Sequence, residues 1–269
     1  DSRKAMAHLA AHFYDCPSND FSLVGITGTN GKTTSTYLVE HIASVLGKRT
    51  GIIGTVGITI AGKTEKSSRT TPESPDLQHL FAQMRVVAME VSSHALDLER
   101  TWDTQFAVTA FTNLTQDHLD YHKTFESYFA AKARLFSSDY PAKRVINIDS
   151  KWGKELLKTC SAKGDAVITT GFDSSAQIHP LSIEYHSGHT DVELEVRGST
   201  YFCSYPLVGK FNVENIMTAF GIALQLGYAP AAVIEALKDA PAIPGRIQRV
   251  NTEHDGGISV YVDYAHTPD

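Results

Sequence analysis

Residues 25–34 read Gly-Ile-Thr-Gly-Thr-Asn-Gly-Lys-Thr-Thr and stand between the apolar run 21–26 and a helix-like stretch at 35–46. A strand, a glycine-rich turn and a helix in this order form a phosphate-binding loop. Glycines let backbone N–H groups close on an anion, and the helix N-terminus adds partial positive charge. Lys32 would reach the β- and γ-phosphates, and Thr33 or Thr34 would hold Mg²⁺. The alternative is a glycine turn without a ligand, but the order of elements favours a nucleoside triphosphate site.

The glycines at 25, 28 and 31 depart from the usual motif, which has a glycine where Ile26 stands. This spacing is the one irregular feature of the loop.

Composition narrows the class of protein. The 269 residues allow one large α/β domain, or one domain with fragments of its neighbours. A net charge of −6 without a basic run argues against a nucleic-acid partner. Three scattered cysteines without a CxxC pair indicate neither a zinc site nor a disulfide framework, and they fit a reducing cytoplasm. No apolar run reaches about 18 residues, so we expect no membrane span.

Apolar strands alternate with helical segments, which predicts a mostly parallel sheet with flanking helices. The predicted strands are 21–27, 49–53, 86–91, 106–111 and 144–148, with a hairpin formed by 56–60 and 63–67; the predicted helices are 33–46, 74–84, 125–136, 211–227 and 230–239. Period-2 alternation between 166 and 205 predicts a smaller, partly antiparallel sheet at one edge. The helix ending at Met84 meets the next strand at Val86 without turn residues, so either a loop was deleted or residues are missing from the sequence there; the second is favoured.

Polar residues follow three of the predicted buried strands. They are the loop at 28–34, the run 89–94 and the run 113–120. In an open parallel sheet, ligands collect outside the carboxyl ends of the strands. We therefore expect the three clusters to meet at one crevice.

Two side chains in these clusters are candidate metal ligands. Glu90 ends an apolar strand and could bind Mg²⁺ directly or through water, unless it is merely exposed at the strand end. His118 stands beside Asp117 and Asp120 and could be a ligand or an orienting donor, although a lone histidine is more often structural. His94 and His122 are expected to pack or to hydrogen-bond.

Lys132 falls inside an apolar stripe. In the helix predicted at 125–136, the stripe runs through 125, 128, 129, 135 and 136, and position 132 lies four residues after Tyr128. A lysine there must snorkel, pair with a charge or be chemically altered. Burial lowers the pKa of a lysine, and the neutral amine could capture carbon dioxide as a carbamate.

Two further segments have a structural and a functional interpretation. Asn212 and Asn215 lie one turn apart at the start of a predicted helix, where Asn212 alone would be a cap. Asn215 on the same face could present its amide to a base or a ribose. The run Thr70–Ser74 is a polar turn that could simply start a helix.

These motifs together resemble the Mur ligase superfamily, ATP-dependent amide-forming enzymes of peptidoglycan assembly. The resemblance rests on Thr27–Thr34, on Glu90–His94 and on Asn113–His118, and it covers nearly the whole chain. Within the superfamily, the runs 70–74, 89–96 and 117–122 are most similar to the branch that adds the third residue of the stem peptide. One departure is Leu98, where some relatives have a substrate-binding glutamine.

The resemblance implies roles for individual residues. ATP and Mg²⁺ would be the cofactors, with Lys32, Glu90, His118 and Lys132 catalytic, and with Thr33, Glu90, His118 and the carbamate of Lys132 at the metals. The nucleotide would be held by Gly28, Thr29, Asn30, Gly31, Lys32, Thr33, Thr34, Asn212, Asn215, Arg246, Asp263 and His266. The UDP-N-acetylmuramoyl dipeptide would contact Thr70, Thr71, Ser92 and Arg100.

The resemblance also implies a domain plan. Residues 1–20 would be the exit from an N-terminal UDP-binding domain, 21–243 the central ATP-binding domain, and 244–269 the start of a C-terminal domain. The expected protein is a monomeric ligase that joins an amino acid to the dipeptide through an acyl phosphate. The alternatives are another ligase of the superfamily, such as folylpolyglutamate synthase, and a non-catalytic nucleotide-binding switch.

Overall fold

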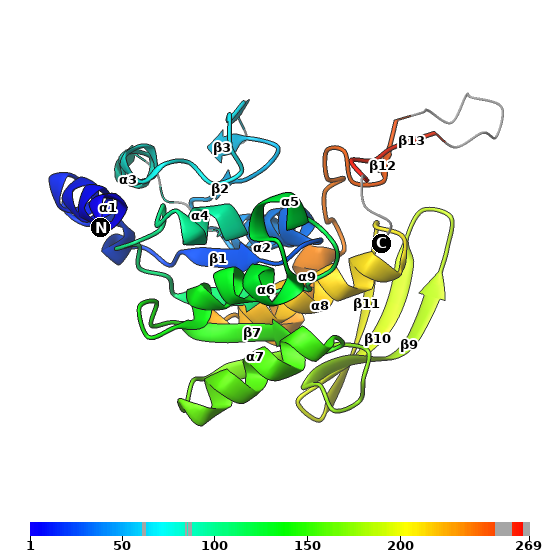
Figure 1. The fold of residues 1–269 in the computed structure, drawn as a ribbon. Helices are drawn as coiled ribbons and strands as arrows, with labels where there is room; N and C mark the ends of the chain where they lie inside the picture. The colour runs from blue at the N-terminus through cyan, green and yellow to red at the C-terminus, as the bar shows by residue number, and fades with distance from the viewer. Residues whose placement is uncertain (61–62, 84, 86–87, 251–259, 266–269) are drawn as a thin grey trace.

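The computed structural model describes residues 1–60, 63–83, 85, 88–250 and 260–265. Its core is a single large sheet (Figure 1). The strands follow the order β11-β10-β9-β8-β7-β6-β1-β5-β2-β3-β4. The strands are β1 (Val24–Thr27), β2 (Gly51–Ile53), β3 (Ile58–Ile60), β4 (Lys63–Glu65), β5 (Ala88–Glu90), β6 (Val108–Phe111), β7 (Lys143–Asn147), β8 (Val167–Thr170), β9 (Ile178–Tyr185), β10 (Thr190–Val196) and β11 (Ser199–Tyr205). Strands β12 (Gln248–Arg249) and β13 (Tyr261–Val262) form a separate antiparallel pair.

The pairing confirms the predicted fold class. Strands β2, β5, β1, β6, β7, β8 and β9 are joined by parallel pairs, and both edges of the sheet are antiparallel. The predicted smaller sheet is the β9–β10–β11 edge, which continues the main sheet through the pairing of β9 with β8. The predicted hairpin is β3–β4, and its turn at 61–62 lies outside the described residues. The suspected gap at Met84–Val86 also falls there, apart from Arg85.

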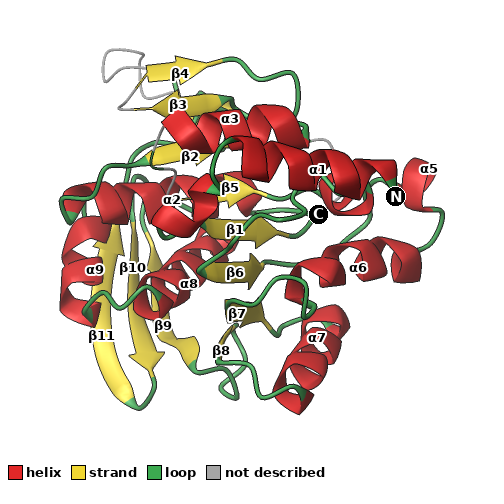
Figure 2. Cartoon of the chain, turned by 90° about the vertical axis from the view of Figure 1, so that its left-hand side faces the viewer, coloured by secondary structure: helices red, strands yellow, loops and turns green. Residues whose placement is uncertain are grey.

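Helices cover both faces of the sheet. They are α1 (Ser2–Phe13), α2 (Lys32–Val45), α3 (Ser74–Gln83), α4 (Ser93–Asp97), α5 (Leu119–His122), α6 (Phe125–Ala133), α7 (Lys151–Ala162), α8 (Lys210–Gln225) and α9 (Pro230–Leu237), with 3-10 turns η1 (Pro17–Asp20) and η2 (Arg134–Phe136). Figure 2 shows α2, α8 and α9 on one side and α6 and α7 on the other. Helices α1, α4, α5 and α7 were not predicted. Among the described helices, none is both long and apolar enough to cross a bilayer.

Alternation along the central strands divides the core into two clusters. Val145 of β7 packs in the cluster with α2, α8 and α9, whereas the next residue, Ile146, packs in the cluster with α3, α6 and α7. Both residues are fully buried. This is the pattern of a parallel strand covered on both faces.

Substitution of Gly153 in α7 tests how closely this helix packs against the sheet. A Cβ there would lie 1.8 Å from the carbonyl oxygen of Asn147. Helix propensity favours Gly153→Ala by up to about 1 kcal/mol, but a backbone clash cannot relax by rotating a side chain. We expect the steric effect to dominate, with a loss of about 2–3 kcal/mol in the free energy of unfolding.

Urea denaturation measures this loss. The matched control is Gly188→Ala, because a Cβ at Gly188 has no neighbour within 4 Å, and its change should stay within about 0.5 kcal/mol. Equal stability of the two variants would contradict the packing described for α7.

Candidate active site

The loop at 28–34 joins β1 to α2 and is braced by the segment that follows β6. The backbone N–H of Thr29 donates to the carbonyl oxygen of Asn113 (3.0 Å), and that of Asn30 donates to Asn113 Oδ1 (2.8 Å). The Thr112 hydroxyl donates to the carbonyl oxygen of Asn30 (2.6 Å). The polar clusters after β1 and β6 therefore meet, as predicted.

At two positions of the loop, only glycine fits without a steric clash. A Cβ on Gly28 would lie 1.9 Å from Thr112 Oγ1, and a Cβ on Gly31 would lie 2.4 Å from Asn215 Oδ1. Gly31 also has a φ of +84°, in the left-handed region that favours glycine. Ile26, at the irregular position, lies in β1 and is fully buried in the core. The unusual spacing thus follows from a strand that extends one residue past this position.

Lys32 is the first residue of α2, and its side chain turns back over the loop. Its Nζ donates to the carbonyl oxygens of Gly28 (3.0 Å) and Thr29 (2.8 Å). Burial lowers the pKa of Lys32, while Glu90 and Asp117 raise it. The lysine therefore places a cation at the mouth of a loop built to hold an anion.

Glu90 is 1% exposed at the end of β5, so the alternative of a solvent-exposed carboxylate is wrong. Its Oε1 accepts from Thr33 Oγ1 (2.9 Å) and from the backbone N–H of Thr55 (2.8 Å), and its Oε2 accepts from Thr55 Oγ1 (3.0 Å). A buried carboxylate beside a hydroxyl of the phosphate loop is a hard oxygen donor set, which suits Mg²⁺. The residues present therefore fit the ion that the resemblance implies.

His118 sits at the N-cap of α5 with a left-handed φ of +52°. Its Nε2 lies 3.3 Å from Asp117 Oδ2, which makes Asp117 its partner, while Asp120 lies in the first turn of α5. The ring packs edge-on against His94, with centroids 4.9 Å apart. Burial lowers the pKa of both imidazoles, so they are neutral at physiological pH. A neutral imidazole is the form that binds a metal.

His122 is buried, and its Nε2 lies 2.9 Å from Ser93 Oγ. Its ring also packs against His94 (5.5 Å) and Tyr128 (5.1 Å). These contacts confirm the predicted packing and hydrogen-bonding roles of His94 and His122.

Lys132 lies on α6 and is 1% exposed, which confirms its place in the buried stripe and contradicts the snorkelling alternative. Its Nζ donates to the Gly28 carbonyl oxygen (2.6 Å) and lies 4.5 Å from the centre of the Tyr128 ring. Within the described residues, no carboxylate oxygen lies within 4.0 Å of this nitrogen. Burial, reinforced by the charge of Lys32, lowers the pKa of Lys132 well below its usual range. Both effects favour the neutral amine over the ammonium form.

The residues expected to contact the dipeptide form one wall of the site. Thr71 is fully buried, and its hydroxyl donates to the carbonyl oxygen of Glu90 (2.9 Å) and accepts from the N–H of Ser92 (3.1 Å). Arg100 Nη1 donates to the Thr71 carbonyl oxygen (3.2 Å). The hydroxyls of Thr70 and Thr55 lie 3.1 Å apart. These bonds bring Thr70, Thr71, Ser92 and Arg100 together around the end of β5, and their contact with a substrate stays a prediction.

The residues expected near the nucleotide base are only partly brought together. Asn215 Nδ2 donates to Asn212 Oδ1 (3.2 Å), and Asn212 Nδ2 donates to the Val208 carbonyl oxygen (2.8 Å). The cap of α8 is Gly209, so the interpretation of Asn212 as its cap is wrong. Both amides are buried, and Asn215 faces Gly31 of the phosphate loop.

The C-terminal segment reaches the phosphate loop through Arg246. Its Nη2 donates to Thr33 Oγ1 (3.3 Å), and its guanidinium carbon lies 5.3 Å from the centre of the Tyr264 ring. Asp263 Oδ2 accepts from the backbone N–H of Ile247 (2.7 Å), which fixes the segment beside Arg246. His266 lies outside the described residues.

Gly54 and Thr55 position Glu90, and the sequence did not identify either residue as part of the site. A Cβ on Gly54 would lie 2.3 Å from Glu90 Oε1, so this glycine lets the carboxylate fit. The signal available was a glycine and a hydroxyl directly after strand 49–53.

A phosphate loop at the carboxyl end of a central parallel strand, with a buried carboxylate beside it, defines a nucleoside-triphosphate-binding α/β domain. The family model described as "Mur ligase middle domain" matches residues 26–223, and the chain belongs to this family. Two relatives are named UDP-N-acetylmuramoyl-L-alanyl-D-glutamate–2,6-diaminopimelate ligase. The one from Thermosynechococcus vestitus is 42% identical over 275 residues and the one from Clostridium botulinum 40% over 274, and all of this chain is covered in both. The chain spans 55% and 56% of their lengths.

Solved structures agree with this assignment. A structure titled UDP-N-acetylmuramoyl-L-alanyl-D-glutamate–2,6-diaminopimelate ligase superposes with a TM-score of 0.78 at 30% identity, covering 87% of this chain and 49% of the other. Folylpolyglutamate synthase of Mycobacterium tuberculosis superposes over all of this chain and 67% of its own, with a TM-score of 0.81 at 20% identity. At that identity the likeness concerns the fold alone.

Gly54→Ala should weaken Mg²⁺-dependent nucleotide binding by about tenfold, or roughly 1.4 kcal/mol, because the added methyl displaces Glu90 from Thr33. Calorimetric titration of a non-hydrolysable ATP analogue, with and without Mg²⁺, measures the effect. Gly188→Ala is again the control and should bind like the parent protein. If Gly54→Ala also bound like the parent, Glu90 would have no part in holding the metal.

Proposed function

We propose that this chain is the ATP-binding part of a ligase that adds the third amino acid to UDP-N-acetylmuramoyl-L-alanyl-D-glutamate. The observation that carries the proposal is the placement of Lys132, a buried amine at the carbonyl of Gly28 within a phosphate-binding loop, where burial lowers its pKa. Nucleotide binding alone does not require such a group. The names of the relatives support the substrate assignment, with 2,6-diaminopimelate as the incoming amino acid.

The proposed reaction has two steps. The γ-phosphate of ATP passes to the D-glutamate carboxylate, which gives an acyl phosphate and ADP. The amino group of the incoming residue then attacks the acyl carbon, the amide C–N bond forms, and phosphate leaves. No protein nucleophile is needed, and the demand on the protein is to position the reactants and to stabilise negative charge.

The chain supplies these functions through a few groups. Lys32 and the N–H groups of the loop bind the phosphates, and Arg246 adds positive charge beside Thr33. Thr33 and Glu90 would hold Mg²⁺, which neutralises charge on the transferring phosphoryl group when bound. His118, kept neutral by burial, would be a further metal ligand.

Lys132 would act as a carbamate. Its neutral Nζ attacks the carbon of carbon dioxide, a C–N bond forms, one C=O π pair becomes an oxyanion, and the nitrogen loses a proton to solvent. The lowered pKa makes this reaction possible near neutral pH, because a protonated amine has no free electron pair. The product replaces a neutral amine with a carboxylate-like group next to Lys32, where a second Mg²⁺ would be held.

The domain plan is part of the proposal. Residues 21–243 would form the catalytic ATP-binding domain, with 1–20 leading from a UDP-binding domain and 244–269 opening a domain that binds the amino acid. Helix α1 packs on α3, and Arg246 contacts Thr33, so both flanking segments lie against the central domain. We propose a monomer that works in the cytoplasm.

Two alternatives make different predictions. Folylpolyglutamate synthase shares the fold at low identity, but the runs at 70–74 and 89–96 favour the peptidoglycan branch. A nucleotide-binding switch offers no reason for a buried lysine at the phosphate loop.

Substrate choice separates the two ligases. We expect the full-length enzyme to release ADP with UDP-N-acetylmuramoyl-L-alanyl-D-glutamate and diaminopimelate, and to show no turnover with a folate and glutamate. A coupled assay for ADP measures both, with the reaction lacking the amino acid as the control. Turnover with the folate alone would overturn the assignment.

Lys132→Ala should lower ligation in the full-length enzyme at least about a thousandfold while changing ATP affinity less than threefold, because Lys132 contacts a carbonyl oxygen of the loop and none of its backbone amides. A short carboxylic acid such as acetate should restore part of the activity, since it supplies the missing carboxylate. Steady-state rates with and without acetate, alongside nucleotide titrations, check both points. Unchanged turnover in Lys132→Ala would remove the carbamate from the mechanism.

A further inference from the structure

The turn between β9 and β10 carries a cluster of metal-binding side chains away from the phosphate loop. The sequence there is Glu184-Tyr-His186-Ser-Gly-His189-Thr-Asp191. The candidate ligand atoms of His186, His189 and Asp191 all lie within 4.8 Å of one another. The proposed ligase reaction uses none of these residues.

The hairpin fixes these side chains in place. Next to the turn, Tyr185 of β9 lies opposite Thr190 of β10, and Glu184 lies opposite Asp191. The backbone N–H of His186 donates to the carbonyl oxygen of His189 (3.0 Å), which closes the turn. The two imidazole rings stack with centroids 4.2 Å apart and planes 12° apart. A site on a regular hairpin needs little rearrangement to bind an ion.

The distances from Asp191 to the two histidines are close to those between ligands of a tetrahedral metal ion. His186 Nε2 lies 3.4 Å from Asp191 Oδ2, and His189 Nε2 lies 3.7 Å from Asp191 Oδ1. Glu184 Oε2 is 3.9 Å from His186 Nε2. Ligand atoms around a tetrahedral Zn²⁺ with bonds of about 2.0–2.1 Å are separated by about 3.3 Å. The distances from Asp191 to the two histidines therefore need to contract by only a few tenths of an ångström.

The electrostatics of the cluster also favour a cation. Glu184 and Asp191 are cross-strand neighbours, and like charges in directly opposite positions destabilise a sheet. Asp191 Oδ1 is buried and has no hydrogen-bond partner. A bound ion would give this oxygen a partner.

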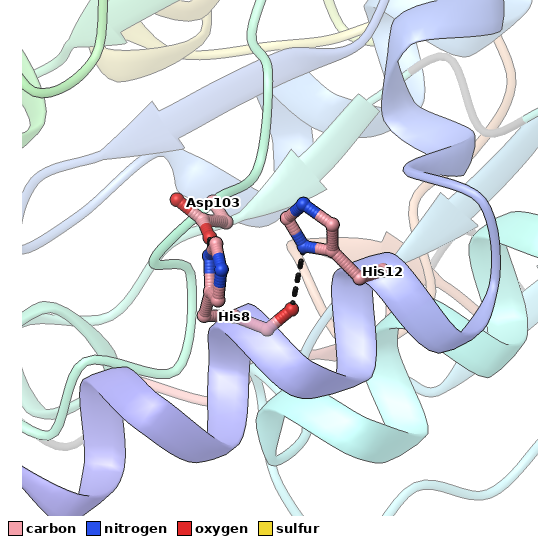
Figure 3. Close-up of side chains that lie close together, drawn as sticks. All are labelled: His8, His12 and Asp103. Atoms are coloured by element: carbon pink, nitrogen blue, oxygen red, sulfur yellow. Dashed lines mark hydrogen bonds and ion pairs between the residues drawn. The ribbon is translucent and has the colours of Figure 1, made fainter.

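A second histidine cluster lacks these features. Figure 3 shows His8 and His12 on α1 with Asp103. There His8 Nδ1 is already hydrogen-bonded to Asp103 Oδ2 (2.5 Å), and His12 Nδ1 is bonded to the His8 carbonyl oxygen (2.9 Å). One oxygen of Asp103 is therefore already bonded to a histidine. This cluster serves as the internal control.

We propose that the β9–β10 turn binds one divalent transition-metal ion of the Zn²⁺ class through His186, His189 and Asp191, with Glu184 as the fourth ligand. Two imidazole nitrogens select Zn²⁺ over the harder Mg²⁺, so this site and the site at Glu90 take different metals. The ion joins both ends of the turn and stabilises the edge hairpin, because it binds only the folded arrangement.

The test is a calorimetric titration of chelator-treated protein with Zn²⁺, in saturating Mg²⁺ to fill the site at Glu90. We expect one Zn²⁺ per chain, with affinity at least tenfold weaker in His186→Ala/His189→Ala and in the isosteric Asp191→Asn. The control His8→Ala/His12→Ala should bind like the parent. Visible absorption of the Co²⁺ form should show the intense bands of a tetrahedral site, lost in the first two variants.

Either of two results would overturn the proposal. One is His186→Ala/His189→Ala binding Zn²⁺ as tightly as the parent. The other is loss of binding in His8→Ala/His12→Ala with the hairpin variants unchanged. Neither outcome depends on ligase activity, so the test is separate from that of the proposed function.

Discussion

The carbonyl oxygen of Gly28 accepts hydrogen bonds from two lysines, Lys32 of α2 and Lys132 of α6. Two ammonium groups at one carbonyl repel each other, and one of the two is fully buried. The low-energy solution is to keep Lys132 neutral, which is the direction in which burial and Lys32 both shift its pKa. The phosphate loop is thus tied to the buried amine of Lys132 by the geometry of one peptide group.

The sheet topology makes this meeting possible. Strand β1 lies between β5 and β6, so the loops that follow all three strands open at one edge. Glu90 lies at the end of β5, and Asn113 and Asp117 lie in the segment that follows β6. Lys132 reaches the same edge from helix α6. The glycines at 28, 31 and 54 let these groups approach closely, since a methyl group at any of them would collide with a neighbouring polar atom.

Much of this arrangement could be predicted from the sequence because it is encoded locally. The phosphate loop, Glu90 at a strand end and Lys132 in an apolar stripe are each visible within a dozen residues. The parts that were missed depend on contacts between distant segments. The partners of Glu90 include Thr55, 35 residues away, and the amide of Asn215 donates to Asn212. Helix α7 was missed because Gly153 in its first turn lowers its helix propensity, although that glycine is what lets the helix approach β7.

The most direct measurement of the central claim is carbon-13 NMR of the protein equilibrated with ¹³C-labelled bicarbonate. The account predicts one carbamate resonance that appears with the label and is absent from Lys132→Ala, because the buried neutral amine of Lys132 is the group that captures carbon dioxide. A parent protein without that resonance, or a resonance that persists in Lys132→Ala, would contradict it.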